Sequence, residues 1–309
     1  TSTKVAIYEG DREVMIKVFR HTNEEMANIH NMEENAAFRK GVIMSYLHEQ
    51  GVDLSALDAI VGRGGLMRPI QGGTYIVGEN MLKDLHSCEY GYHVCNLGGI
   101  LANEIGGELG KPAYVVDPPV VYEVADVAKL SGHPDFPRRP LFHALNQKAT
   151  ARIYAKQVGK RYEDLNLIVA HMGGGSSVSL HRNGLVIDVN DALGGDGPFS
   201  PERAGSVPAF PLIEMCFSGR YSKAEIKKML VGKGGAVAHL GTNDFREVSA
   251  RAESGDEACA TFLKAFCISV AKYIGSMAAV VGGKVDAIIL TGGIAHNKAI
   301  AAEITDRVG

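Results

Sequence analysis

The sequence predicts an α/β protein of two domains, and three observations support this. The chain has 309 residues, which is more than one hydrophobic core usually serves, so two domains are expected. Strand patterns alternate with helix patterns along both halves, as in α/β folds. A pattern of strand, tight turn and strand near the N-terminus returns in the middle of the chain, which favours two similar halves.

The first half begins with a hairpin pattern. The run "TSTKVAIYEGDREVMIKVF" alternates on both sides of the turn Glu9-Gly10-Asp11 and has a hydroxyl-rich entry. Helices are predicted within "ENAAFRKGVIMSYLHEQG", ending at Gly51, and within "YHVCNLGGILANEIGGELG". Short buried strands are predicted within "LDAIVGRGG" and "PAYVVD", the second ending on Asp117.

The second half repeats this order. Three prolines in "SGHPDFPRRP" give way to a long helical pattern, so the domains are predicted to span residues 1–142 and 143–309. The run "SSVSLHRNGLVIDV" again has hydroxyls, a strand, a turn and a second strand, although hydroxyls are common before strands and chance is an alternative. A helix from about Asp256 to Met277, the strand "VDAIILT" and a helix after "GGIAHN" complete this half.

Composition excludes several classes of protein. The net charge of −3 and the isoelectric point near 6.4 provide no field that would attract nucleic acid or an anionic membrane. The chain has five cysteines, an odd number spread widely, which favours a reducing cytosol over a disulfide framework. No signal peptide or membrane span is visible, so a soluble cytoplasmic protein is expected.

Glycine-rich turns are the main chemical signal. They occur at Gly173 to Ser177, in the loop 194–203 and at Thr291-Gly292-Gly293. Glycine there either relieves a backbone conformation or lets a ligand such as a phosphate approach the main chain. No P-loop or dinucleotide-binding glycine motif is present. The segment around Lys233 has the wrong spacing and is predicted to be a loop between helices.

Charged residues and histidines near these turns are candidate site residues. Arg63 and Arg203 carry guanidinium groups suited to phosphoryl oxygens, although either could form a surface ion pair. Asp117 follows an apolar strand and could hold Mg²⁺, or it could cap a turn. His143 and His171 could be ordinary half-buried histidines, and His171 could brace the glycine turn.

A zinc site is a weaker alternative. The stretch "HSCEYGYHVC" contains His86, Cys88, His93 and Cys95, which are possible zinc ligands. It has no C-x-x-C pair, and Cys95 fits the apolar helix pattern that follows as a small core residue.

Several runs together resemble butyrate kinases over essentially the whole chain and in order. They include "IVGRGGLMRPIQGGTY", "FHALNQKATARIYA", "IVAHMGGGSSVSL", "DALGGDGPFSPERAGSVP", "HLGTNDFREV" and "ILTGGIAHN". Butyrate kinases are grouped with acetate kinases, sugar kinases, actin and chaperone ATPases. The resemblance therefore implies two duplicated ribonuclease-H-like domains around a nucleotide cleft, with the acyl substrate on the side of the first domain and the nucleotide on that of the second.

The resemblance also implies roles for individual residues. Arg63, Asp117, His143 and Arg203 match the catalytic positions of the family, and Asp117 would hold the metal. The positions implied for the nucleotide are His171, Gly173, Gly174, Gly175, Ser176, Asp244, Arg246, Gly292, Gly293, Ile294 and Asn297.

The function implied is reversible phosphorylation of butyrate by ATP with Mg²⁺. Acetate kinases read F-H-G-T-S-H where this chain has Phe142 to Gln147, and this departure favours the butyrate branch. Kinases for acetate, propionate or isobutyrate are alternatives, as is an actin-like or chaperone-like ATPase module.

The resemblance also implies a homodimer or larger oligomer. The family's first phosphate loop and a C-terminal glutamate are not in the sequence, so we expect the residues before Thr1 to supply that loop.

Overall fold

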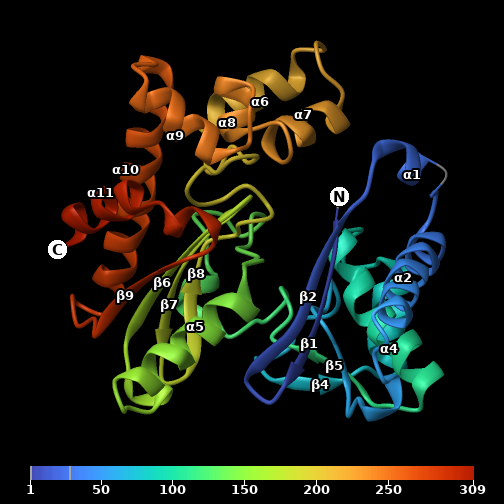
Figure 1. The fold of residues 1–309 in the computed structure, drawn as a ribbon. Helices are drawn as coiled ribbons and strands as arrows, with labels where there is room; N and C mark the ends of the chain where they lie inside the picture. Colours follow the sequence, from blue (N-terminus) through green and yellow to red (C-terminus); the bar gives the residue numbers. More distant parts are fainter. Residues whose placement is uncertain (1, 28) are drawn as a thin grey trace. The chain divides into compact units, whose positions relative to one another are not determined.

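The computed structural model describes residues 2–27 and 29–309, which form two compact units. Unit 1 comprises Thr1–Arg68 and Gly73–Pro118, and unit 2 comprises Pro69–Gly72 and Pro119–Gly309. Thr1, the first of the hydroxyl residues expected before the first strand, lies outside the described residues. Each unit has its own sheets and helices (Figure 1).

The change from unit 1 to unit 2 lies at Pro118 and Pro119, whereas the sequence placed it at residue 142. Two features attach the intervening segment to unit 2. Val121, Val124 and Phe142 are buried in one cluster with residues of strand β8 (Leu185–Val189). The buried carboxylate of Glu123 accepts hydrogen bonds at 2.7 Å from Lys148 and at 2.8 Å from the backbone N–H groups of Gly72 and Val186.

Unit 1 begins with the expected hairpin. Strands β1 (Ser2–Glu9) and β2 (Arg12–Arg20) pair antiparallel around a turn at Gly10 and Asp11, which confirms that prediction. A short helix, α1 (Asn23–Ala27), and the long helix α2 (Met32–Glu49) follow. Ile43 and Leu47 of α2 pack with Ile105, and inward side chains of the hairpin complete this cluster.

A second, three-stranded sheet lies in unit 1. Its order is β3 (Ile60–Gly62), β5 (Ala113–Val116) and β4 (Thr74–Ile76), with β3 parallel and β4 antiparallel to β5. Helices α3 (Glu79–Ser87) and α4 (Leu97–Leu109) follow β4. The expectation of a fully buried β3 is wrong, because Val61 is 63% exposed. Only one face of β3 packs on α4, where Gly62 lies against the backbone of Gly98.

Unit 2 is built on a four-stranded sheet of order β8-β7-β6-β9. The strands are β6 (Leu167–Met172), β7 (Ser176–Arg182), β8 (Leu185–Val189) and β9 (Ala287–Thr291). The first three form an antiparallel meander, in which the pairing of β7 with β8 confirms the second predicted hairpin, and β9 pairs parallel to β6.

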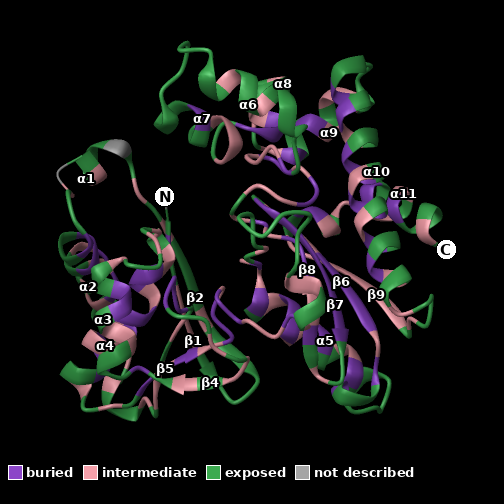
Figure 2. Ribbon diagram, turned by 180° about the vertical axis from the view of Figure 1, so that it is seen from behind, coloured by how far each residue is buried: buried purple, intermediate pink, exposed green. Residues whose placement is uncertain are grey.

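Helices cover both faces of this sheet, which is why β6 is apolar apart from His171. Ile168, Ala170 and Met172 pack in the cluster that contains helix α10 (Glu257–Val280). Leu167 and Val169 point to the opposite face and pack with helix α5 (Ala144–Gln157). Figure 2 shows that the buried residues of unit 2 concentrate along these central strands and the helix faces that meet them.

The remaining helices belong to unit 2. They are α6 (Ala209–Phe217), α7 (Lys223–Leu230), α8 (Gly235–Leu240), α9 (Phe245–Glu253) and α11 (Lys298–Val308). Residues 231–234 connect α7 to α8, so the prediction of a loop around Lys233 is confirmed.

Helix α10 is long and apolar enough to cross a membrane by length and composition alone. The expectation that no such segment is present is therefore wrong on length and composition, because Lys264 and Lys272 divide the helix into short apolar runs in the sequence. Phe266, Val270 and Ile274 of α10 are buried in the core of unit 2. Core helices of water-soluble proteins have the same profile.

Candidate active site

Two histidines from different elements of unit 2 are stacked on each other. His143 precedes α5 at its N-cap position, and His171 lies near the end of β6. Their rings are 3.8 Å apart between centroids and nearly parallel, at 11°. Both side chains are half-buried. The fold therefore joins two of the residues that the sequence singled out.

Strand β7 and the first turn of α5 supply the polar partners of the two rings. Nδ1 of His143 lies 2.8 Å from Oγ of Ser177, and Nε2 of Gln147 donates to that same Oγ at 2.8 Å. Nδ1 of His171 lies 2.7 Å from Oδ1 of Asn146, which also accepts from the hydroxyl of Thr291 at 3.2 Å.

These partners were missed by the sequence analysis. His143, Asn146 and Gln147 have the spacing i, i+3 and i+4, which places them on one face of a helix. That spacing was the available signal. Ser177 and Thr291 lie on other strands, and only the folded sheet brings them to α5.

The glycine turn between β6 and β7 contacts the loop that carries Arg203. The N–H of Gly173 donates to the carbonyl of Gly175 at 3.0 Å, and the hydroxyl of Ser200 donates to the carbonyl of Gly174 at 2.7 Å. The guanidinium of Arg203 also donates to the carbonyl of Ala192. The turn and this loop thus form one hydrogen-bonded unit.

The geometry of the turn decides between the two explanations for its glycines. None of Gly173, Gly174 and Gly175 has a positive φ, so relief of a left-handed backbone is not the reason for them. A Cβ on Gly175 would lie 2.1 Å from Nη1 of Arg203, so the guanidinium would have to move away. A Cβ on Gly174 would meet no described atom within 4 Å. Close approach therefore explains Gly175, and the neighbour is an arginine of the chain itself.

Ser176 follows the turn as the first residue of β7. Its side chain is 2% exposed, and its hydroxyl has no hydrogen-bond partner among the described residues. A buried polar atom without a partner is costly, and such atoms in native proteins often have a ligand or water as partner.

Gly292 closes the same edge of the sheet. It follows β9 with a φ of +87°, and a Cβ there would lie 2.3 Å from the carbonyl oxygen of Met172 at the end of β6. Glycine is therefore required at this position both by its conformation and by its packing. Gly292 thus lies beside the strand end that carries His171.

The segment after Gly292 leads to a second group of candidates. Gly293 starts a short 3₁₀ turn in which Ile294 is buried, and Asn297 caps helix α11. Nδ2 of Asn297 donates to the hydroxyl of Ser249 on α9 at 3.0 Å. Helix α9 thereby links Asn297 to Asp244 and Arg246 at its own N-terminus.

Asp244 and Arg246 form an exposed ion pair. Nη2 of Arg246 lies 2.6 Å from Oδ2 of Asp244, and the Arg246 guanidinium lowers the pKa of this carboxyl to about 2. The Asp244 carboxylate also accepts from the backbone N–H of Arg246 and caps α9. The pair therefore orders the start of α9.

Arg63 and Asp117 belong to unit 1, where they follow adjacent strands. Arg63 follows β3 and Asp117 follows β5, and these strands run parallel, so both residues lie at one edge of the sheet. Arg63 is exposed, whereas Asp117 is fully buried.

Asp117 has an unusual backbone conformation. Its φ is +39°, which is rare for a residue with a side chain. Its Oδ1 accepts from the backbone N–H of Gly73 at 2.8 Å, and its own N–H donates to the carbonyl of Gly73 at 2.9 Å. These two bonds join the end of β5 to Gly73, the residue before β4.

The cysteine-containing stretch has different partners. His86 lies 3.3 Å from Glu33, and Nδ1 of His93 accepts from the N–H of Cys95. Cys95 lies on a 3₁₀ turn before α4 rather than in that helix, and burial raises the pKa of its thiol to about 11. Among residues 2–27 and 29–309, no three His, Cys, Asp or Glu side chains are grouped as metal ligands.

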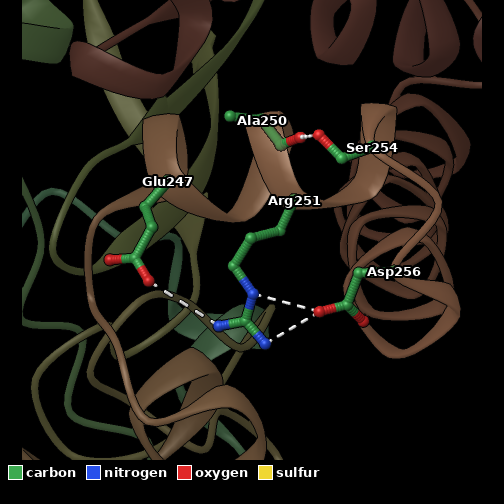
Figure 3. A pocket seen from close by; sticks show the side chains of 5 residues that line it. All are labelled: Glu247, Ala250, Arg251, Ser254 and Asp256. Carbon is green, nitrogen blue, oxygen red and sulfur yellow. Dashed lines mark hydrogen bonds and ion pairs between the residues drawn. The ribbon is translucent and has the colours of Figure 1, made fainter.

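A surface hollow of about 310 Å³ lies beside α9. Figure 3 shows Arg251 between the carboxylates of Glu247 and Asp256, with its guanidinium 2.8 Å from Asp256. The charges in this hollow are thus engaged with each other, and none of the candidate site residues lines it.

The site in unit 2 combines a glycine turn with an arginine and two histidines. Comparisons with known proteins show the family to which the chain belongs. A sequence model of the acetokinase family matches residues 136–307, more than half of the chain. This chain belongs to the acetokinase family. It is 52% identical to butyrate kinase 1 of Clostridium acetobutylicum over 308 residues, which are 100% of this chain and 87% of that protein. It is 51% identical to a probable butyrate kinase of Clostridium botulinum over the same shares of the two chains.

Solved structures of acetate and propionate kinases share the fold of this family member. The acetate kinase of Entamoeba histolytica matches with a TM-score of 0.77 at 17% identity, over 99% of this chain and 83% of that one. The propionate kinase of Francisella tularensis matches with a TM-score of 0.71 at 21% identity, over 99% of this chain and 78% of the other. Both matches extend over both units.

Proposed function

We propose that this acetokinase-family protein is a butyrate kinase. It would transfer the γ-phosphoryl group of ATP to the carboxylate of butyrate and release butyryl phosphate and ADP, in a reversible reaction. The observation that carries the proposal is the 51–52% identity, along the whole chain, to proteins named butyrate kinase.

The chemistry makes a general base unnecessary. Unperturbed carboxyl groups titrate near about 4, so the attacking carboxylate is already ionised at neutral pH. Catalysis then depends on alignment and on neutralising charge on the transferring phosphoryl group. We assign Arg203 to the equatorial phosphoryl oxygens and His143 to a hydrogen bond with the same group. The contact of Arg203 with the glycine turn supports this assignment.

The glycine turn is proposed to bind nucleotide phosphates. In the turn Gly173–Gly175, the main-chain N–H groups of Gly174 and Gly175 lie close together, and the buried hydroxyl of Ser176 lacks a partner among the described residues. His171 and Gly292 lie at the same strand ends. We place the adenosine near Gly293, Ile294 and Asn297 and the nearby helix α9, with Asp244 and Arg246 as contacts.

For unit 1 we propose that Arg63 guides the carboxylate and that Asp117 serves Mg²⁺. Mg²⁺ in kinases usually binds one or two carboxylates together with substrate phosphates and water. A single strand-end carboxylate, held at Oδ1 by the N–H of Gly73, is compatible with that pattern. Bound Mg²⁺ would supply charge neutralisation at the phosphates.

The resemblance to acetokinases also supports at least a homodimer. Analytical ultracentrifugation of the full-length protein tests this, and a monomer at micromolar concentration would contradict it.

An acid panel tests the activity. The full-length protein is incubated with Mg-ATP and straight or branched acids of two to five carbons, and hydroxylamine traps the acyl phosphate. We expect the highest kcat/KM with butyrate. A higher value with acetate, propionate or isobutyrate would reassign the substrate within the family, and ATP turnover without any acyl phosphate would overturn the kinase proposal.

A further inference from the structure

The amide of Gln147 has a defined orientation. Its Nε2 lies 2.9 Å from the carbonyl oxygen of Ser177 and 3.5 Å from that of Val169. Carbonyl oxygens only accept hydrogen bonds, so the end of the amide that faces them must be the NH₂ group. The opposite end, Oε1, is buried without a partner among the described residues. Turning the amide over would place that oxygen against two carbonyls, which is worse.

This orientation fixes the role of the Ser177 hydroxyl. Nε2 of Gln147 also lies 2.8 Å from Oγ of Ser177 and donates to it. The hydroxyl has a single proton, and its other close partner is Nδ1 of His143 at 2.8 Å. Ser177 therefore donates its proton to Nδ1. The hydrogen bonds then run in one direction: the amide of Gln147 donates to the hydroxyl of Ser177, and this hydroxyl donates to the imidazole of His143.

We propose that Ser177 and Gln147 are positioning residues that hold His143 in the tautomer protonated at Nε2. The proposal rests on the proposed function for its consequence, because a neutral His143 in this tautomer presents an N–H donor to the phosphoryl group. In the other tautomer the same nitrogen would present a lone pair, which repels phosphoryl oxygens. The two residues would thus determine whether His143 stabilises the transferring group.

The ring stack disfavours a positive charge on both histidines at once. The imidazoles of His143 and His171 lie face to face, 3.8 Å apart between centroids. Two stacked imidazolium cations would repel each other strongly at this distance. A neutral His143 with an enforced tautomer donates a hydrogen bond without that repulsion.

Nitrogen NMR of the free protein tests the tautomer directly. The histidines are labelled with ¹⁵N, and the His143 signals are identified by their loss in a His143→Gln variant. We expect Nδ1 to have the shift of an unprotonated nitrogen and Nε2 that of a protonated one at pH 8. A protonated Nδ1 in the wild-type protein would overturn the proposal. This measurement needs no substrate, so it stands even where the butyrate assay fails.

Two variants test the positioning. Ser177→Ala removes the donor to Nδ1, and Gln147→Met removes the donor to Ser177 with little change of volume. In both we expect the His143 shifts to move towards those of a ring exchanging between tautomers. We also expect kcat to fall at least about tenfold in Ser177→Ala, since loss of one well-placed donor costs about 10² to 10³, with KM for butyrate changed little. Unchanged His143 shifts in these variants, or a rise in KM without a fall in kcat, would overturn the positioning role.

Ser179→Ala is the matched control. Ser179 lies on the same strand, is also fully buried, and its hydroxyl contacts a different histidine, His181, at 2.7 Å. We expect this variant to lose stability but to keep the His143 shifts and kcat. Ser177→Thr retains the hydroxyl, so we expect this variant to have the His143 shifts and the kcat of the wild-type protein. A control that lowers kcat as much as Ser177→Ala would contradict a specific role for Ser177.

Discussion

The hairpins β1–β2 and β7–β8 have the same sequence pattern but very different surroundings. In β7 all residues except the last are buried, because β6 and β8 flank it in the sheet and α10 packs on one face. In the β1–β2 sheet the two strands pair only with each other, and Val14, Ile16 and Val18 are exposed. Local pattern thus specifies a hairpin, whereas burial depends on strands that lie far away in the sequence.

The hairpins also share a polar feature. Each begins with a hydroxyl that contacts a histidine: Oγ1 of Thr3 lies 2.7 Å from Nε2 of His21, and Oγ of Ser177 lies 2.8 Å from Nδ1 of His143. Only the second lies beside the glycine turn and Arg203. The same local chemistry therefore serves stability in one unit and, by our proposal, catalysis in the other.

The largest expected effect is at the turn before β7. Arg203→Ala should lower kcat by more than about a hundredfold, because a well-placed arginine contributes about 10³ to 10⁵ to phosphoryl transfer. Gly175→Ala should have a similar effect, since its Cβ would occupy the place of the guanidinium. Steady-state kinetics measure both.

Gly10→Ala is the control in the other hairpin. Gly10 has a φ of +58° and open space around it, so we expect a loss of about 1 kcal/mol in unfolding free energy and an unchanged kcat. Near-normal turnover of a folded Arg203→Ala protein would refute the assignment of Arg203.

The next largest effect is a difference in unfolding free energy between truncations in the two hairpins. Leu180→Ala in β7 should lower the unfolding free energy by about 2 to 5 kcal/mol, because Leu180 is 0% exposed. Val18→Ala in β2 should cost less than about 1 kcal/mol, since Val18 is 47% exposed. Urea denaturation measures both, and equal losses would mean that the β1–β2 hairpin has a covered outer face in solution.

A smaller effect concerns pH and the buried His181 in β7. Burial lowers its pKa to about 3, whereas an unfolded histidine titrates near about 6.5. The unfolded chain therefore binds more protons between these values, so this contribution to stability is complete above pH 6.5 and declines as the pH falls. From pH 7.5 to 5.5 it should cost about 1 kcal/mol.

Denaturation of a His181→Gln variant at both pH values checks this. The variant should lose less stability than the wild type over that interval. His21→Gln in unit 1 is the control: burial also lowers the pKa of His21, but this side chain is only half-buried, and its removal should change the pH dependence less. An identical pH dependence in His181→Gln would contradict the prediction.

Much of the fold could be predicted from the sequence because it rests on local patterns. Periodicity identified both hairpins and the long helices, and composition identified the glycine turn. The unit boundary could not be predicted, because Val121 and Phe142 are drawn to unit 2 by contacts with β8. The hydrogen bonds around the two histidines were missed for the same reason: Ser177 and Thr291 reach the residues of α5 only through the folded sheet.

The smallest expected effect on kcat, none at all, tests whether the hydroxyl of the first hairpin is purely structural. Oγ1 of Thr3 accepts from the guanidinium of Arg39 at 2.7 Å and contacts His21. Thr3→Val keeps the shape but removes these bonds, so we expect a loss of about 1 to 2 kcal/mol in unfolding free energy and no change in kcat. Denaturation and steady-state kinetics are measured on the same preparation. If kcat fell as in Ser177→Ala, the two hydroxyls would have equivalent roles and the division between a structural and a catalytic hairpin would be wrong.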